Sequence, residues 1–583
     1  MKSKLILIAA FIFTLSVATF VRAEYKVEPI EDIPPGYEKY VYAPEEHMKW
    51  WKDAKFGFFV HWGPAVIGGK TISHSRGRGR IGEDLPDPNP GKIPLEIYDN
   101  FYKQFNPVKF NAKEWVDVMK KSGAKYFIFT TKHHDGFSMF DSKYTDYDIM
   151  STPFKRDVSK ELADACHEAG IKIFWYLSQP DWHHPDYNTE NHPRFVVHLH
   201  NQLRELCTNY GKIDGFWFDG LGKNPAMWDG LELLKMIRTL QPGLLVNTRI
   251  SHQAQKWGDY QTPEQHLGVF SPKRPWETCM TIGGPWSWCG PSEPKSFEYL
   301  IRALVRCAGM GGNFALNTGP TPEGTLHEPH VKRYIEIGQW LEKYGDSIYG
   351  TRCGPYKPGP FGVSTHKDNR IYLHILHPIW QNDTITIPSP GIKVKSCRAL
   401  TGGKPKFKEK NDKLEIKLAS KHHNQMDTII ELELDGQASG IEPEKISLVP
   451  LNLGKKASCS SFRISRNKKM DASSLVKDKE EIFSRTGRVA KQWSAENEDE
   501  KPWVMLDLGK PMKFNHIVAY AGKGHARKYW IEYKDDSGKW QTFLKGEKLS
   551  ELSEQIEPIT AQYVRLNLGK SANIETFDLY YTE

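Results

Sequence analysis

The sequence predicts a multidomain chain in which a (β/α)8 barrel of the TIM type precedes two all-β sandwich domains. Between about residues 40 and 350, short apolar runs alternate with amphipathic helical patterns. After residue 350 the helical patterns stop, and segments that alternate apolar with polar residues take their place. The length of 583 residues also exceeds what one hydrophobic core accommodates, so several domains are expected.

Seven apolar runs are expected to form the strands of the barrel. Helical patterns lie between them, and those at 111–123 and 158–170 both end at a glycine, a common helix stop. Fully apolar strands that alternate with helices indicate a parallel sheet covered on both faces, and seven or eight such units suit a barrel. A doubly wound open sheet usually carries a glycine-rich phosphate loop after its first strand, and this sequence has none. The predicted strands lie within residues 56–63, 124–136, 171–182, 213–220, 244–250, 274–281 and 312–320.

Polar and aromatic residues follow these apolar runs. In a barrel, the carboxyl ends of the strands converge on one face, where active sites lie. We therefore expect these side chains to gather in one site. They are His61, His133, His134, Trp182, Asp219, Arg249, Glu277 and Asn317.

The changes of pattern divide the chain into four parts. We expect a signal peptide at 1–23, the barrel at 24–350, a small β-sandwich at 351–440 and a second β-sandwich at 441–583. The last two parts are assigned to β structure because segments such as "DTIIELELDG" and "AQYVRLNLGK" alternate like antiparallel strands.

The N-terminus has the pattern of a secretory signal. Lys2 and Lys4 precede an apolar run that ends near Phe20, and a small-residue cleavage site follows at Ala23. The run is short for a membrane span, and no other segment is a candidate for one. We expect export to the periplasm or the extracellular space.

Charge and cysteine content exclude some functional classes. The net charge of +8 is small for 583 residues, and Lys and Arg are scattered without interleaved aromatic residues. Nucleic acid is therefore not an expected partner. The eight cysteines show no zinc-type spacing and lie mostly in apolar patterns, so most are expected to be buried thiols.

Carboxylates lie at predicted strand ends and in loops, and this pattern indicates glycoside hydrolysis. That reaction uses a pair of carboxylates that flank the scissile bond. Asp219, in "GFWFDG", is the candidate nucleophile, with a helix N-cap as its alternative role. The acid/base is either Glu264, in "YQTPEQH", or Glu277, in "RPWETCMT". Burial against aromatic rings such as Trp276 raises a carboxyl pKa as an acid requires, and the residues alone leave this choice open.

Two adjacent histidines, His133 and His134, raise the question of a metal site. Neighbouring strand residues point to opposite faces, and a third ligand with zinc-type spacing is missing. We expect these histidines to bind substrate hydroxyls, and we expect no catalytic metal or cofactor.

Several of these segments together resemble a known enzyme family. "KFGFFVHWGP", "KHHDGFSMFDSKYTDYDIM", "GFWFDG", "WETCMTI" and "GNFALNTGPTPEG", in this order, are similar to glycoside hydrolase family 29, the retaining α-L-fucosidases. The resemblance spans about residues 40 to 440. It implies that Asp219 is the nucleophile and that the "TPEQ" segment carries the acid/base, which favours Glu264 over Glu277. It also implies that the sugar is held by His61, His133, His134, Tyr176, Trp217, Arg249, Glu277 and His74.

The chain departs from the family in one loop. Many members carry a Glu and a Trp after "HWGP", whereas this sequence reads "GGKTISHSRGRGR", with Thr71 and His74 at those places. The difference leaves L-galactose, which is L-fucose with a hydroxyl on C6, as an alternative sugar. Arg76, Arg78 and Arg80 of the same loop are candidates to meet a sulfate or another anion on a polysaccharide, or they form a solvated loop.

The C-terminal part has a resemblance of its own. "PWVMLDLGKPMKFNHIVAY" and "YVRLNL" are similar to F5/8 type C domains and to family 32 carbohydrate-binding modules. This resemblance implies a glycan-binding β-sandwich, and some members hold a structural calcium.

The resulting expectation is an exported retaining exo-glycosidase that removes terminal α-L-fucosides from oligosaccharides or polysaccharides. The first alternative is an α-L-galactosidase of the same family that acts on algal galactan oligosaccharides, sulfated or not. The second is an inactive glycan-binding protein, against which Asp219 and the two candidate glutamates argue.

Overall fold

The structure is a computed structural model that describes most of the chain after residue 25. The predicted signal peptide, 1–23, lies outside the described residues. These are 26–30, 32–77, 93–251, 257–359, 361–376, 380, 383–443, 450–465, 468–476, 493–521, 526–549, 551–569 and 573–581.

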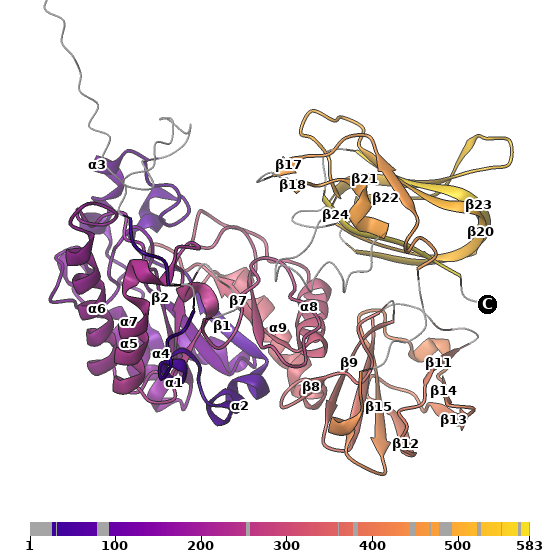
Figure 1. Ribbon diagram of the computed structural model, residues 1–583, viewed down its shortest axis with the longest axis horizontal. Coiled ribbons are helices and arrows are strands. Elements are labelled where there is room, and N and C mark those ends of the chain that lie inside the picture. Colours follow the sequence, from indigo (N-terminus) through magenta and orange to yellow (C-terminus); the bar gives the residue numbers. More distant parts are fainter. Residues whose placement is uncertain are drawn as a thin grey trace, which may run out of the picture.

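A parallel sheet forms the N-terminal part of the molecule (Figure 1). Its strand order is β5-β4-β3-β2-β1-β7-β6, and every neighbouring pair is parallel. All seven predicted apolar runs form these strands, and the sheet is consistent with a TIM-like barrel. The strands are β1 (Phe56–Val60), β2 (Tyr126–Lys132), β3 (Lys172–Leu177), β4 (Gly215–Phe218), β5 (Leu245–Val246), β6 (Trp276–Thr281) and β7 (Gly312–Thr318).

Helices lie between most successive strands and cover the outside of the sheet (Figure 1). Between β5 and β6 the described residues form only the 3-10 turn Thr248–Ile250. The two predicted helices are confirmed, and each begins at a side-chain cap. Asn111 accepts from the amides of Lys113 and Glu114, and Asp157 accepts from that of Lys160. The helices are α1 (Glu38–Val41), α2 (Glu45–Ala54), α3 (Leu95–Tyr98), α4 (Ala112–Lys121), α5 (Val158–Glu168), α6 (His192–Thr208), α7 (Gly230–Leu240), α8 (Phe297–Met310) and α9 (Glu328–Tyr344).

Alternate residues of the strands pack into two separate layers. The outward residues join the helices in the largest apolar cluster, whereas the inward residues form a second, smaller cluster. The inner layer therefore lies directly beneath any site at the carboxyl ends of the strands. The strand residues of this layer are Phe59, Tyr126, Ile128, Phe174, Tyr176, Trp217, Leu245, Cys279 and Ala315.

Two groups of antiparallel sheets follow the barrel, as the alternating patterns predict. The first group has one sheet in the order β12-β15-β10-β9-β8 and another in the order β11-β14-β13, around one apolar core. Its strands are β8 (Arg352–Cys353), β9 (Gly362–Lys367), β10 (Arg370–Ile375), β11 (Thr384–Pro388), β12 (Val394–Ala399), β13 (Lys406–Lys410), β14 (Lys413–Lys417) and β15 (Thr428–Leu434).

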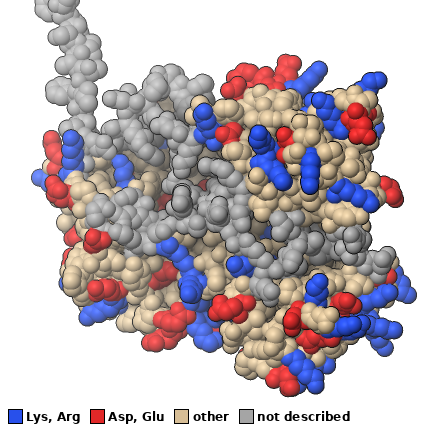
Figure 2. Space-filling view, turned by 45° about the vertical axis from the view of Figure 1, so that its right-hand side comes forward, with Lys and Arg blue, Asp and Glu red and all other residues tan. Residues whose placement is uncertain are grey.

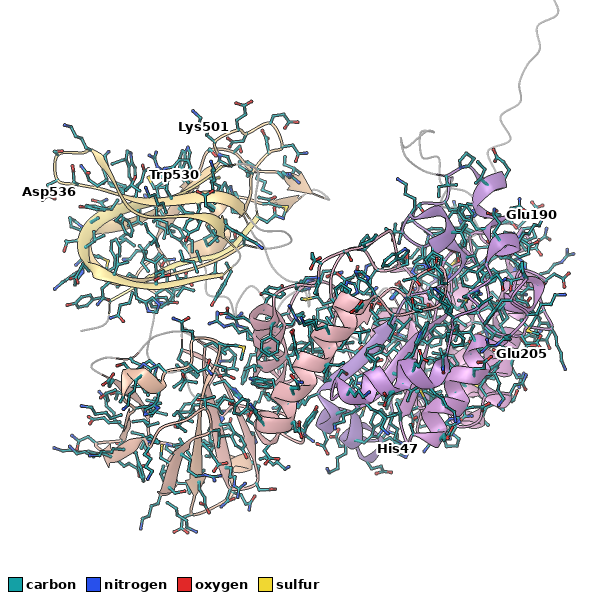
Figure 3. All side chains as sticks on the ribbon, turned by 180° about the vertical axis from the view of Figure 1, so that it is seen from behind. His47, Glu190, Glu205, Lys501, Trp530 and Asp536 are labelled. Atoms are coloured by element: carbon teal, nitrogen blue, oxygen red, sulfur yellow. The ribbon has the colours of Figure 1, made fainter. Side chains whose placement is uncertain are left out.

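The C-terminal group is a larger antiparallel sheet with its own core. Its strand order is β19-β24-β20-β23-β21-β22, and β16 pairs with β20. Seen from behind in Figure 3, Trp530 and Asp536 mark this part of the molecule, and His47 and Glu205 mark the barrel. The strands of this sheet are β16 (Lys456–Cys459), β19 (Trp493–Ser494), β20 (Trp503–Ala521), β21 (Ala526–Lys534), β22 (Trp540–Leu549), β23 (Glu551–Leu568) and β24 (Asn573–Tyr580). Strands β17 (Ile464–Ser465) and β18 (Lys468–Lys469) pair with each other in a separate two-stranded sheet.

Helix α8 of the barrel contacts both β regions. Arg302 donates to the carbonyls of Leu376 (2.9 Å) and Met426 (3.0 Å), which lie in the first β region. Arg306 donates to the hydroxyl of Tyr520 on β20 at 3.0 Å. One helix thus connects the barrel to each of the parts that follow it.

The surface and the cysteines agree with the composition. On the face shown in Figure 2, Lys and Arg side chains are interspersed with Asp and Glu across the described surface. Each of the eight cysteines is a free thiol, and five of them are buried, as expected. Among the helices of the described ranges, none combines the length and the apolar content needed to cross a membrane.

Candidate active site

Asp219 lies where β4 ends, at the carboxyl end of the parallel sheet. Its amide donates to the Gln179 side chain at 3.0 Å, which fixes the backbone just beyond the strand. The amide of the following Gly220 donates to the carbonyl of Arg249 at 3.1 Å, and a Cβ on Gly220 would lie 2.7 Å from that oxygen. Only glycine fits this close approach, so the "DG" pair brings the Asp219 and Arg249 segments together.

The carboxylate of Asp219 is almost enclosed, with 13 % of its side chain exposed, and three groups contact it. Arg249 Nη1 donates to Oδ1 at 3.1 Å, the Tyr176 hydroxyl donates to Oδ2 at 2.9 Å, and His134 Nε2 lies 3.5 Å from Oδ2. Burial alone would raise the pKa of Asp219, but Arg249, His134 and Tyr176 together hold that pKa below its usual value. The carboxylate is therefore ionised at neutral pH.

Arg249 connects Asp219 to a second carboxylate. It lies in a short 3-10 turn after β5, Thr248–Ile250, and its Nε donates to Thr262 Oγ1 at 2.8 Å. Its Nη2 donates to Glu264 Oε2 at 3.1 Å, while Nη1 holds Asp219. The guanidinium also lies 4.7 Å from the centre of the Trp217 ring. One guanidinium thus brings the two predicted catalytic carboxylates to the same site.

Glu264 occupies the more open side of this arrangement. It forms a parallel bridge with Cys279 of β6, so its segment runs alongside the barrel wall. Its side chain is 41 % exposed, compared with 13 % for Asp219. Of the two carboxylates, Glu264 is the one that solvent and a departing group can reach.

Glu277 does not lie where the sequence predicted. It is the second residue of β6, so it lies near the amino end of that strand, and the expectation of a carboxyl-end position is wrong. The residue is fully buried among the inner-layer side chains. Its carboxylate accepts from the Tyr126 hydroxyl at 2.5 Å and from Trp217 Nε1 at 2.9 Å. Burial raises the pKa of Glu277 to about 7, against the opposing effect of these two hydrogen bonds.

Three buried histidines form one wall of the site, each fixed through its Nδ1 atom. His61 Nδ1 donates to Asn317 Oδ1 at 2.7 Å, because an amide oxygen only accepts. His133 Nδ1 lies 2.6 Å from Ser73 Oγ, and His134 Nδ1 lies 2.5 Å from Ser178 Oγ.

Two histidines of the wall, His61 and His133, present neutral imidazoles to the site. Burial lowers the pKa of His61 to about 4, and burial together with the neighbouring histidines lowers the pKa of His133 well below its usual value. Neutral His61 carries its proton on Nδ1, so Nε2 is an acceptor suited to a sugar hydroxyl. The ring of His133 stacks on Tyr176 with a centroid distance of 5.3 Å.

His74 lies at the edge of this histidine wall. Its side chain is exposed, and its ring centroid lies 5.6 Å from those of both His134 and Trp182. The preceding Ser73 adopts φ 56° and bonds His133, while its amide donates to the Tyr98 hydroxyl at 2.7 Å. The contacts of Ser73 thus fix this part of the loop against the site and bring His74 to it.

The arginines of the same loop do not all face a ligand. Arg76 is buried and donates to both carboxylate oxygens of Asp99 at 2.6 Å, and to the carbonyl of Trp182 at 3.2 Å. These bonds occupy its guanidinium, so the idea that Arg76 meets a sulfate is wrong. Arg78 and Arg80 lie outside the described residues.

Sequence reasoning missed Trp286, a half-buried residue of the loop after β6. Its ring centroid lies 4.9 Å from that of His61, and its carbonyl accepts from Asn317 Nδ2 at 2.7 Å. The nearby Trp288 turns away and contacts His327. Both tryptophans lie in "GGPWSW", and nothing in these letters tells which of them faces the site.

The described residues bring together most of the predicted site. Asp219, Arg249, Glu264, Tyr176, Trp217 and the histidine wall contact one another directly or through one neighbour. Within the ranges that the structure describes, no three His, Cys, Asp or Glu side chains converge as metal ligands would. The arrangement therefore offers an ionised carboxylate, a more exposed second carboxylate and neutral imidazoles.

Comparison with known proteins gives consistent matches over the barrel and the C-terminal part. The profile of the family described as Alpha-L-fucosidase matches residues 35–346, and that of the F5/8 type C domain matches residues 456–580. Human plasma alpha-L-fucosidase is 30 % identical over 354 residues, which is 56 % of this chain and 75 % of the human protein. Alpha-L-fucosidase of Dictyostelium discoideum is 29 % identical and covers 52 % of this chain and 71 % of its own.

Solved structures of related enzymes share the fold. Alpha-L-fucosidase isoenzyme 1 from Paenibacillus thiaminolyticus is 31 % identical with a TM-score of 0.60, covering 67 % of this chain and 99 % of that one. A family 29 alpha-L-fucosidase from Bacteroides thetaiotaomicron, described as a trapped covalent intermediate, is 28 % identical with a TM-score of 0.61 and covers 70 % and 100 % of the two chains. These matches show that the chain belongs to glycoside hydrolase family 29, the alpha-L-fucosidase family, and that it carries an F5/8 type C domain at its C-terminal end.

Proposed function

We propose that the protein is an exported retaining exo-glycosidase that hydrolyses terminal α-L-fucosides from glycans. The observation that supports this proposal most is the pair of carboxylates, Asp219 and Glu264, held on opposite nitrogens of one guanidinium, that of Arg249. A retaining glycosidase needs one carboxylate that stays ionised and a second that exchanges a proton. The unequal exposure of these two carboxylates suits that division of roles.

In the first step, an Asp219 oxygen attacks the anomeric carbon. The bond from that carbon to the glycosidic oxygen breaks, and Glu264 gives its proton to the departing oxygen. The product of this step is a glycosyl ester on Asp219. In the second step, Glu264 takes a proton from water, the water oxygen attacks the anomeric carbon, and the ester bond breaks. Two inversions give net retention of configuration, and no cofactor is required.

Arg249 has to change partners during this cycle. Glu264 Oε2 accepts from Arg249 Nη2, whereas in the first step Glu264 gives a proton to the glycosidic oxygen. We infer that Glu264 leaves Arg249 when the glycan enters, while Asp219 keeps its contacts with Arg249 and Tyr176. The greater exposure of Glu264 is consistent with this movement.

The histidine wall and the aromatic residues are proposed to select the sugar. His61, His133 and His134 offer hydrogen-bonding ring nitrogens to the sugar hydroxyls, and the two neutral imidazoles, those of His61 and His133, can act as acceptors. Trp286, beside His61, offers a flat apolar surface to the face of a pyranose. The related enzyme from Bacteroides thetaiotaomicron was captured with 2-fluoro-fucosyl fluoride, which supports an L-fucosyl substrate for this chain.

The fold around the site is proposed to be a complete (β/α)8 barrel. Residues 260–264 run between β5 and β6, where Tyr260 forms a parallel bridge with Asn247 and Gln261 forms one with Trp276. This segment supplies the contacts of an eighth strand. We also propose the division into a barrel at 24–350 and β-sandwich domains at 351–440 and 441–583.

An α-L-galactosidase is the second candidate. His74 places an exposed imidazole beside His134 and Trp182, and an imidazole can hydrogen-bond the C6 hydroxyl that L-galactose has and L-fucose lacks. Comparing kcat/KM for an aryl α-L-fucoside and an aryl α-L-galactoside separates the two candidates. A strong preference for the fucoside rejects the second, and glycan binding without release of either sugar would support an inactive binding protein.

The F5/8 type C domain is proposed to bind glycan and keep the enzyme near its substrate. The side chains described in this domain do not support the calcium that the resemblance implies. Among the residues described in this domain, no three carboxylate, thiol or imidazole side chains converge, although calcium sites usually contain several carboxylate oxygens. We derive no role for calcium.

An azide experiment tests the roles of the two carboxylates. Asp219→Ala should lose turnover of an aryl α-L-fucoside, and added azide should restore release of the aryl group with formation of a glycosyl azide of inverted configuration. Glu264→Ala should give a glycosyl azide of retained configuration instead. Failure of azide to form a glycosyl azide with the Asp219 variant would reject Asp219 as nucleophile.

A further inference from the structure

The mechanism proposed above leaves one buried carboxylate of the barrel unused. Glu277 is fully buried below the site, and both of its oxygens accept hydrogen bonds, from Tyr126 and from Trp217. Tyr126 is itself close to Asn313, whose amide lies 3.4 Å from the Tyr126 hydroxyl and donates to the Trp51 carbonyl at 2.8 Å. The carboxylate therefore lies in a buried cluster of hydrogen-bonded side chains and is shielded from solvent.

We propose that Glu277 is a positioning residue that holds Trp217 in place. Through Trp217, it also positions Arg249 and Tyr176, the two donors to the Asp219 carboxylate. The inference rests on the proposed function only in taking Asp219 as the nucleophile. It assigns Glu277 neither the acid/base role nor a contact with the sugar.

The contacts of Trp217 show how such positioning would work. The Trp217 ring stacks on Tyr176 with a centroid distance of 5.4 Å and an interplanar angle of 19°. The Arg249 guanidinium lies 4.7 Å from the centre of the same ring. Arg249 and Tyr176 donate to Oδ1 and Oδ2 of Asp219, so one indole supports the donors to both oxygens. A shift of this indole would move both donors together.

The chemistry of Glu277 argues that it does more than fill space. A buried indole N–H needs an acceptor, and a backbone carbonyl or a side-chain amide would be sufficient. Using a carboxylate instead is costly, because a charged group must be desolvated. A carboxylate forms shorter and stronger hydrogen bonds and accepts two donors at once. Burial raises the pKa of Glu277 to about 7, so both protonation states are present near neutrality, and each keeps an oxygen for the indole. The residue is therefore suited to fix an indole in one place.

The test compares three variants of the full chain on aryl α-L-fucosides with good and poor leaving groups. Glu277→Gln keeps an acceptor for Trp217 and should stay within about 5-fold of wild-type kcat, because a neutral hydrogen bond replaces a charged one. Glu277→Met removes the acceptor at similar volume and should lower kcat about 100-fold, equally for all leaving groups, because the donors to Asp219 are misplaced. Glu264→Gln should lose most activity on poor leaving groups and little on good ones.

A second readout separates positioning from general destabilisation. The groups that face the Asp219 carboxylate are Arg249, Tyr176 and His134, with Glu264 beyond Arg249. If Glu277→Met displaces the first two, the acid limb of the kcat/KM profile should move to higher pH. Thr278→Val, at the next residue of β6 on its opposite face, should lower stability while leaving that limb and kcat in place. If Glu277→Met fails to fold, Trp217→Phe, which removes only the N–H and part of the ring, should give the same movement of the limb.

Three outcomes would overturn the inference. The first is that Glu277→Met keeps the wild-type kcat and an unchanged acid limb of the kcat/KM profile. Another is a loss that depends on the leaving group and is rescued by azide, which would make Glu277 the acid/base. The third is an equal loss in Glu277→Gln and Glu277→Met. The Asp219→Ala azide experiment tests the proposed function separately, so these outcomes in active enzyme count against this inference alone.

Discussion

At the scale of single residues, the site depends on how a buried carboxylate is kept ionised. Asp219 follows the apolar strand β4, and in a barrel such a position opens into the active site. This much could be read from "GFWFDG". The partners that lower its pKa come from three other segments, at Tyr176, His134 and Arg249, and only the fold brings them to it.

Removing Arg249, the strongest of these partners, should shift the acid limb of the pH profile of kcat/KM. In Arg249→Ala, the pKa of Asp219 should rise, because burial then opposes ionisation with less compensation. The acid limb of kcat/KM should shift to higher pH, and kcat/KM at neutral pH should fall about 100-fold. Arg352→Ala, which breaks a half-buried ion pair with Asp53, is the control and should leave the profile in place. An unmoved limb in Arg249→Ala would show that Asp219 does not titrate there.

Glu277 should also be visible in the pH dependence of stability. Its pKa is raised from 4.5 to about 7 by burial, so the folded protein binds more protons than the unfolded chain between these values. Stability should therefore fall as pH rises from about 4.5 to 7, by at most about 3.5 kcal/mol at about 1.4 kcal/mol per pKa unit.

The measurement is the free energy of urea unfolding at several pH values, for wild type and for Glu277→Gln. The difference between the two proteins should change across this window, because glutamine does not titrate. A constant difference would mean that Glu277 titrates at its ordinary pKa.

At the scale of secondary structure, the strands were the most predictable feature, because both faces of a barrel strand are covered and the strand sequence is apolar throughout. Strand ends were harder to predict. The run 274–281 contains Glu277, and a polar residue at the start of a short strand resembles one at its end. Loops gave the least information: Trp286 and Ser73 reach the site through backbone paths that no periodic pattern records.

Helix α8 carries a prediction at this scale. Arg302 is mostly buried and donates to the carbonyls of Leu376 and Met426 in the first β region. Arg302→Ala leaves these carbonyls without their charged donor and should lower the free energy of unfolding by about 3 kcal/mol. Urea unfolding measures this, with the exposed Lys332→Ala on α9 as control. Equal stabilities of the two variants would show that α8 does not hold the β region.

At the scale of the whole molecule, the barrel and the C-terminal sheet have separate cores. The apolar cluster of the C-terminal part contains residues from 451 onward, and the clusters of the barrel contain none of them. The antiparallel sheets that follow the barrel could be expected from the change of pattern after residue 350. The contact between Arg306 and Tyr520 could not, because it joins distant segments through two polar side chains.

Removing the C-terminal part should separate catalysis from glycan retention. A chain that ends at residue 443 should hydrolyse a small aryl α-L-fucoside with kcat within about 2-fold of the full chain, because its barrel core is intact. It should bind less to an insoluble fucosylated glycan in a pull-down assay. Equal retention of both chains would contradict a glycan-binding role for the F5/8 type C domain.

Capture of the covalent intermediate tests the central claim most directly. Incubation with 2-fluoro-fucosyl fluoride should form a glycosyl ester that hydrolyses slowly, because fluorine at C2 destabilises the oxocarbenium-like transition state of both steps. Mass spectrometry of the digested protein should then find one 2-fluorofucosyl group, on the peptide that contains Asp219. A label on the peptide of Glu264 or Glu277, or an unlabelled protein that still hydrolyses α-L-fucosides, would contradict the account.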